Sequence, residues 1–80
     1  MTKAELMEKL QELMRDVFDN DEIEIDEDTT AEDIEEWDSL TNIQLVDAIE
    51  KAFGLKLTSK EIVSWDDVGE MADALLNKIN

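Results

Sequence analysis

Residues 37–46 read Trp37-Asp38-Ser39-Leu40-Thr41-Asn42-Ile43-Gln44-Leu45-Val46. Asp38 is a good N-cap residue, because its short carboxylate can accept hydrogen bonds from the unpaired backbone N–H groups of the next turn. The sequence therefore predicts a helix that begins at or beside Ser39. A hydroxyl that faces outward there lies where the helix dipole and the free N–H groups favour a phosphate.

The helix predicted from Ser39 carries apolar side chains on two sides. At about 100° per residue, one stripe is predicted to face the core; it comprises Leu45, Ala48, Ile49, Ala52 and Phe53, with Val46 at its margin. Leu40 and Ile43 fall on the opposite side, among the polar residues Gln44, Asp47 and Glu50. Apolar side chains ringed by acids are typical of a docking surface. The alternative is that a neighbouring loop or short helix covers them.

The stretch before Trp37 divides into a helix and a long acidic loop. Residues 2–18 have helical periodicity, with a capping-box pattern at Thr2 and Glu5. The predicted core stripe of this helix is Leu6, Met7, Leu10, Leu13, Met14, Val17 and Phe18. Residues 19–37 form the loop, which Ile23 and Ile25 are expected to anchor, while a single turn from Thr30 turns Ile34 inward. Trp37 is expected to pack against the core.

The stretch after the central helix contains one short and one longer helix. Gly54 is expected to end the central helix in a left-handed conformation. A complete capping box at Thr58 predicts a short helix, and Ser64 or Asp66 is expected to cap the last one. The stripe of this last helix is Val68, Met71, Ala72, Leu75, Leu76 and Ile79, and Gly69 lies beside it, where it would permit close helix approach. The predicted fold is all-α, a small four-helix bundle with three longer helices and one short helix.

Composition limits the partners and the chemistry. The 80 residues, 1–80, are expected to form a single domain. They hold 7 basic and 23 acidic side chains, and the net charge of −16 disfavours nucleic acid, favours basic protein partners and favours a monomer. Without Cys or His, disulfides, ordinary zinc sites and Ser–His catalysis are excluded. No apolar run approaches membrane-spanning length and no signal segment opens the chain, so no membrane insertion and a cytoplasmic location are expected.

The acidic loop invites comparison with a calcium-binding loop. Four aspartates cluster there, namely Asp19, Asp21, Asp26 and Asp28. No glycine stands at the sixth position from any of them, which an EF-hand requires. A solvated loop with weak, unselective cation binding is the prediction, and no metal site is assigned.

Asp38-Ser39-Leu40, followed by Ile43, Leu45-Val46, Ile49-Glu50 and Phe53-Gly54, resembles the modification site and second helix of acyl carrier proteins. The resemblance extends over essentially the whole chain. It implies that a phosphopantetheinyl transferase attaches 4'-phosphopantetheine from coenzyme A to Ser39, and that the arm then carries acyl groups as thioesters. Asp38 would cap the helix and help to hold the transferase's metal.

The resemblance also implies roles for the outward face of the helix. Leu40, Ile43, Gln44, Asp47 and Glu50 would dock acyl-loading and acyl-processing enzymes that have basic patches. The chain would be a carrier and not an enzyme, because no general base stands near Ser39.

The chain departs from the commonest fatty-acid pattern near the site. Glu35-Glu36-Trp37 replaces a glycine-containing pair, Gln44 stands where an acid is usual, and Asp47 stands where an apolar residue is usual. These changes suggest a dedicated carrier for fatty-acid or related acyl or polyketide biosynthesis. An aminoacyl or D-alanyl carrier is the alternative within the class. An unmodified acidic adaptor, which would not need Ser39, is the alternative from another class.

Overall fold

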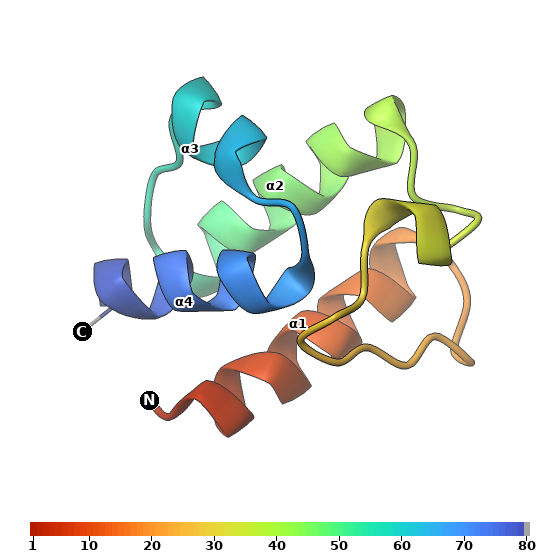
Figure 1. The fold of residues 1–80 in the computed structure, drawn as a ribbon, viewed down its shortest axis with the longest axis horizontal. Helices are drawn as coiled ribbons and strands as arrows, with labels where there is room; N and C mark the ends of the chain where they lie inside the picture. The colour runs from red at the N-terminus through yellow and green to blue at the C-terminus, as the bar shows by residue number, and fades with distance from the viewer. Residues whose placement is uncertain (80) are drawn as a thin grey trace.

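The computed structural model describes residues 1–79 and contains four α-helices and one short 3-10 helix (Figure 1). The elements are α1 (Lys3–Val17), η1 (Ala31–Asp33), α2 (Ser39–Phe53), α3 (Ser59–Ser64) and α4 (Val68–Ile79). No strand forms within residues 1–79. The prediction of an all-α fold with three longer helices and one short helix is therefore confirmed.

The core lies where α1 meets α2 and α4, which both pack against it. Figure 1 shows α1 running along the other two long helices, with the loop between α1 and α2 leaving the far end of α1 and folding back toward the start of α4. Buried apolar side chains come from all three helices and from the loop: Leu6, Leu10, Met14, Phe18, Ile23, Ile34, Leu45, Ile49, Val68, Met71, Ala72 and Leu75. The inward positions predicted for Ile23 and Ile34 are confirmed.

Short-range capping sets the ends of most helices. In α1, Thr2 Oγ1 accepts from Glu5 N–H and Thr2 N–H donates to the Glu5 carboxylate, and this backbone N–H holds the pKa of Glu5 below its usual range. The same reciprocal pair joins Thr58 and Glu61 at the start of α3. Gly54 ends α2 with φ 66°, in the left-handed region that glycine adopts without strain. These three predictions are confirmed.

The start of α4 differs from the prediction, because Asp67 and not Ser64 or Asp66 caps it. Asp67 Oδ1 accepts from the Glu70 N–H at 2.8 Å, and α4 begins at the next residue, Val68. The predicted alternatives act elsewhere: Ser64 Oγ donates to the carbonyl of Glu61, and Asp66 is exposed.

Hydrogen bonds to the acidic loop explain why α4 begins at Val68. The Val68 N–H donates to Thr29 O at 2.8 Å and the Gly69 N–H donates to Glu27 O at 2.9 Å. Loop carbonyls thus satisfy first-turn N–H groups that a helix leaves unpaired. Lys3 adds a side-chain link, because its ammonium pairs with Glu27 of the loop and with Asp73 of α4.

Two further predictions are wrong. Gly69 permits the close approach of the loop and not of a helix, since a Cβ at this position would lie 2.8 Å from Glu27 O. Ala52 is exposed rather than in the core. It lies in the last turn of α2, where side chains of α1 leave a pocket of about 230 Å³ instead of closing over it.

Candidate functional site

Ser39 is exposed and is the first residue of α2. Asp38 Oδ1 accepts from the backbone N–H groups of Leu40 and Thr41, both at 2.9 Å. In return, the Asp38 N–H donates to Thr41 Oγ1 at 2.8 Å, which completes a capping box. The helix start predicted from Asp38 is confirmed, and these bonds hold the backbone on both sides of the serine.

The electrostatics of the cap keep Asp38 ionised. The pKa of the Asp38 carboxyl is lowered from its ordinary 3.8, mainly by the backbone N–H of Thr41 and further by that of Leu40, which together outweigh desolvation. Thr41 Oγ1 also donates to Glu36 O at 2.8 Å, so the last turn of the loop is bonded to the first turn of α2. A carboxylate used in this way is a poor proton acceptor for the neighbouring hydroxyl.

Trp37 packs at the end of the loop, as the sequence predicts. Its ring centroid lies 6.0 Å from that of Phe18, with 39° between the two planes. Its Nε1–H donates to Asn42 Oδ1 at 2.9 Å. These contacts fix the indole beside the first turn of α2, where one side of it remains open to a pocket.

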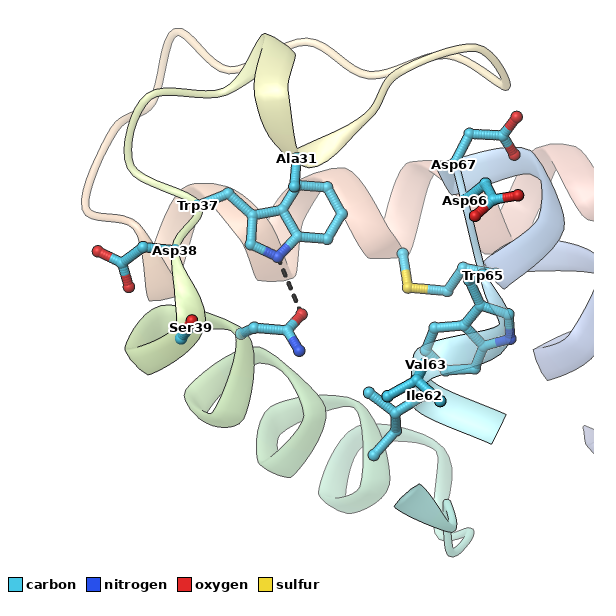
Figure 2. Close-up of a pocket in the computed structure, with 11 residues that line it drawn as sticks. Ala31, Trp37, Asp38, Ser39, Ile62, Val63, Trp65, Asp66 and Asp67 are labelled. Carbon is cyan, nitrogen blue, oxygen red and sulfur yellow. Dashed lines mark hydrogen bonds between the residues drawn. The ribbon is translucent and has the colours of Figure 1, made fainter. Parts of the chain in front are cut away.

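The pocket beside Ser39 has a volume of about 440 Å³. It is lined by Ala31, Trp37, Asp38, Ser39, Asn42, Ile62, Val63, Trp65, Asp66, Asp67 and Met71. Figure 2 shows Trp37, Asp38 and Ser39 on one side, and Ile62, Val63 and Trp65 of α3 and its following linker on the other. The site is therefore a serine at the mouth of a pocket with two indole walls.

Only Asp38 and Ser39 among these lining residues were predicted as site residues, and the ones not predicted include Asn42 and Trp65. Asn42 stands three residues after Ser39, a spacing that places both on one face of a helix, so a signal was available. Trp65 carried no comparable signal, because its position opposite Trp37 depends on how α3 packs beside α2.

The outward face of α2 exposes two large apolar side chains. Leu40 is 67% exposed and Ile43 is 68% exposed, so no loop or helix within residues 1–79 covers them. Gln44 and Asp47 are exposed beside them, and Asp47 Oδ2 lies 2.9 Å from Lys51 Nζ.

Glu50 differs from the other residues predicted for this face. It is half-buried, and its Oε2 accepts from the Leu57 N–H at 2.8 Å. Its carboxylate therefore holds the linker between α2 and α3 against α2.

No group of three or more acidic side chains within residues 1–79 is arranged to hold a metal ion. None of the helices in this part of the chain is long and apolar enough to cross a membrane.

Comparison with known proteins bears on the serine site. A family model described as "Phosphopantetheine attachment site" matches residues 8–75. The acyl carrier protein of Petrotoga mobilis is 34% identical over 80 residues, which cover 100% of this chain and 94% of that protein. The acyl carrier protein of Thermosynechococcus vestitus is 30% identical over 80 residues, which cover 99% of this chain and 98% of that protein.

A solved structure matches the fold as well as the sequence. The solution NMR structure of holo acyl carrier protein from Geobacter metallireducens superposes with a TM-score of 0.87 and 32% identity. The match covers 92% of this chain and 85% of that one.

Proposed function

The chain belongs to the acyl carrier protein family, and from that premise we propose that it carries acyl intermediates as thioesters on a 4'-phosphopantetheine arm attached to Ser39. The prosthetic group of the family is 4'-phosphopantetheine. Its terminal thiol supplies the thioester chemistry. The family match over residues 8–75 also supports the proposal that residues 1–80 form one carrier domain.

The observation that carries the proposal is the position of the Ser39 hydroxyl. It is exposed, it opens a capped helix, and Ser39 Oγ has no hydrogen-bond partner within residues 1–79. The positive end of the helix dipole stabilises the negative phosphodiester that attachment creates. The pocket of about 440 Å³ at the same serine gives the arm room, so the residues present fit the group.

Attachment is a substitution at phosphorus. The Ser39 Oγ–P bond forms, the P–O bond inside the pyrophosphate of coenzyme A breaks, and adenosine 3',5'-bisphosphate leaves. The hydroxyl proton passes to a base of the transferase, because the chain has no His and Asp38 is held as an ionised cap. Asp38 Oδ2 accepts no hydrogen bond within residues 1–79, so in this proposal it coordinates the transferase's Mg²⁺.

We assign enzyme docking to the outward face of α2. Leu40 and Ile43 supply apolar contact, and Gln44 and Asp47 flank them with polar groups. Exposed charge pairs contribute little affinity, and act mainly on encounter rate and on the choice of partner. Glu50 contributes to this face through its charge, while its carboxylate also holds the Leu57 backbone.

The cargo belongs to fatty-acid or related acyl or polyketide biosynthesis in this proposal. Because Gln44 and Asp47 depart from the commonest fatty-acid pattern, an aminoacyl or D-alanyl carrier is the alternative within the class. A net charge of −16 supports a monomer through self-repulsion, and we place the carrier in the cytoplasm, where coenzyme A is available to the transferase.

Intact mass after incubation with coenzyme A, Mg²⁺ and a broad-specificity phosphopantetheinyl transferase tests the proposal. We expect the native chain to gain one phosphopantetheinyl group and Ser39→Ala to gain none. Ser59→Ala is the matched control, because Ser59 is also an exposed serine at the first position of a capped helix, and it should be modified like the native chain. An unmodified native chain that circular dichroism shows to be folded would favour the acidic adaptor.

A further inference from the structure

The segment that leads into Ser39 has little backbone structure of its own. Residues 34–38 lie between η1, which ends at Asp33, and α2, which begins at Ser39. One backbone hydrogen bond lies within this segment, from the Trp37 N–H to Ile34 O at 3.1 Å. The direction in which the chain enters α2 therefore depends on hydrogen bonds made by side chains.

The hydroxyl of Thr41 links this segment to the first turn of α2. A hydroxyl has one proton to donate, and the nearest acceptor is Glu36 O at 2.8 Å, while Asp38 O and Asp38 Oδ1 both lie at 3.3 Å. The same hydroxyl oxygen accepts from the Asp38 N–H at 2.8 Å. One side chain thus binds the backbone at two points, three residues before Ser39 and immediately before it.

The carboxylate of Glu36 extends this link to the end of α1. Glu36 is half-buried, and its Oε2 accepts from Asn20 Nδ2 at 2.8 Å. Asn20 is fixed in turn, because its Oδ1 accepts a backbone N–H two residues later at 3.0 Å and its own N–H donates to Arg15 O at 3.0 Å. A continuous hydrogen-bond path therefore runs from the last turn of α1 through Asn20, Glu36 and Thr41 to the residue before Ser39.

Resting on the proposed attachment at Ser39, we propose that Asn20, Glu36 and Thr41 are positioning residues for the modification reaction. They act by fixing the backbone that presents the Ser39 hydroxyl to the transferase, and they contact neither coenzyme A nor the reacting atoms. A nucleophile that is already held in its attacking geometry loses less freedom on the way to the transition state, which raises the rate of the chemical step.

Glu36 acts inward in this proposal and not as a charge that docks the transferase. Its carboxylate binds Asn20, whereas the neighbouring Glu35 is exposed and takes part in no hydrogen bond or ion pair within residues 1–79. The apolar docking side chains Leu40 and Ile43 are held by α2 itself. Loss of the path should therefore slow the reaction in the bound complex and leave the affinity for the transferase almost unchanged.

Single-turnover modification tests this, with coenzyme A and Mg²⁺ saturating, the broad-specificity transferase in excess, and intact mass as the readout. Varying the transferase concentration separates the saturated rate from the half-saturating concentration. Thr41→Val keeps the shape of the side chain and removes the hydroxyl, so we expect the saturated rate to fall by about fivefold or more and the half-saturating concentration to stay within about twofold. Thr41→Ser keeps the hydroxyl and should restore the native rate to within about twofold.

Variants of Glu36 separate its hydrogen bond from its charge. Glu36→Ala removes the acceptor for Asn20 and should lower the saturated rate by about threefold or more, whereas Glu36→Gln keeps an oxygen acceptor and should stay within about twofold of the native rate. Glu35→Ala is the matched control, because it removes the same charge from the adjacent exposed position, and it should behave like the native chain. Thr2→Val removes the hydroxyl that caps α1 and controls for a general loss of stability.

Backbone order gives a second readout that does not involve the transferase. In nitrogen relaxation measured by NMR on the unmodified chain, the order parameters of the Asp38 and Ser39 N–H groups should be about 0.85, the value of rigid backbone. They should fall toward about 0.6 in Thr41→Val and stay at the native value in Thr2→Val.

Three outcomes would overturn the inference. These are native saturated rates in both Thr41→Val and Glu36→Ala, equal losses in Glu36→Gln and Glu36→Ala, and an equal loss in Thr2→Val. The second outcome would make Glu36 a docking charge, and the third would reduce the effect to stability. If circular dichroism shows that Thr41→Val does not fold, the two Glu36 variants decide. Failure of the attachment proposal is distinct, because the native chain then gains no mass.

Discussion

Gly69→Ala tests how the acidic loop that leads to Ser39 is held on α4. Gly69 is buried, and a Cβ there would lie 2.8 Å from Glu27 O, 3.0 Å from Glu27 Cβ and 3.3 Å from Glu27 Cα. Two of these atoms are backbone, so no flexible side chain can move aside to relieve the contact. The loop must shift, and the Gly69 N–H···Glu27 O bond of 2.9 Å and the Val68 N–H···Thr29 O bond of 2.8 Å lengthen with it.

The expected change in the free energy of unfolding combines opposing effects. Each hydrogen bond contributes about 0.5–1.5 kcal/mol net, and overpacking costs about 1–3 kcal/mol when the structure cannot relax. Alanine has better helix propensity than glycine by about 1 kcal/mol in a helix interior, and by less in the first turn where Gly69 lies. We therefore expect Gly69→Ala to destabilise the fold by about 1–3 kcal/mol, which lowers Tm by about 5 °C or more.

Urea titration followed by circular dichroism measures this change. Ala74→Gly, in the interior of the same helix, is the control: it should lose about 1 kcal/mol through helix propensity, without a contact to the loop. A Gly69→Ala protein as stable as the native chain, or more stable, would refute the close-packed contact with Glu27. Intact-mass analysis should still show modification of the folded fraction, since Ser39 is unchanged.

Three further predictions concern the core, the caps and the charge. Leu75→Ala, at a fully buried position, should lower the free energy of unfolding measured in urea by about 2–5 kcal/mol. Leu40→Ala, at a position 67% exposed, should change it by less than about 0.5 kcal/mol. Similar losses in the two variants would contradict the assigned core. Backbone hydrogen bonds of the caps lower the pKa of Glu5 and Asp38, and Lys78 together with the Thr58 N–H lowers the pKa of Glu61. The stability that these contacts add is therefore present above the ordinary values of 4.5, 3.8 and 4.5 and is lost as pH falls through the lower folded values. Urea titrations from about pH 7 to about pH 2 should show this loss, and Glu61→Gln should remove its share; unchanged stability below about pH 4 would count against the caps. With a net charge of −16, Tm should rise when NaCl increases from about 10 mM to about 500 mM, and a flat or falling Tm in calorimetry would contradict dominant self-repulsion.

Local physics accounts for what could be predicted at the candidate site. The start of α2 depends on Asp38 and Thr41, and its end depends on Gly54, so each boundary is decided within a few residues. The exposure of Leu40 and Ile43 follows from their angle on the same helix. Family resemblance, rather than this geometry, supplied the role expected of Ser39.

Contacts between distant segments account for what the sequence did not predict. Asp67 rather than Ser64 or Asp66 caps α4, because loop carbonyls some forty residues earlier pair with the N–H groups of its first turn. Periodicity placed Glu50 on the outward face and could not show that its carboxylate binds the Leu57 backbone.

By itself, then, the sequence determined four helices, the caps of α1, α2 and α3 and the two faces of α2, since helical periodicity and capping act over three or four residues. Only the tertiary structure decided that the loop docks on Gly69, that Ala52 stays exposed, and that Trp37 and Trp65 line one pocket beside Ser39. These features depend on how segments far apart in the chain pack together. The sequence pattern of one segment does not show which distant segment it will contact.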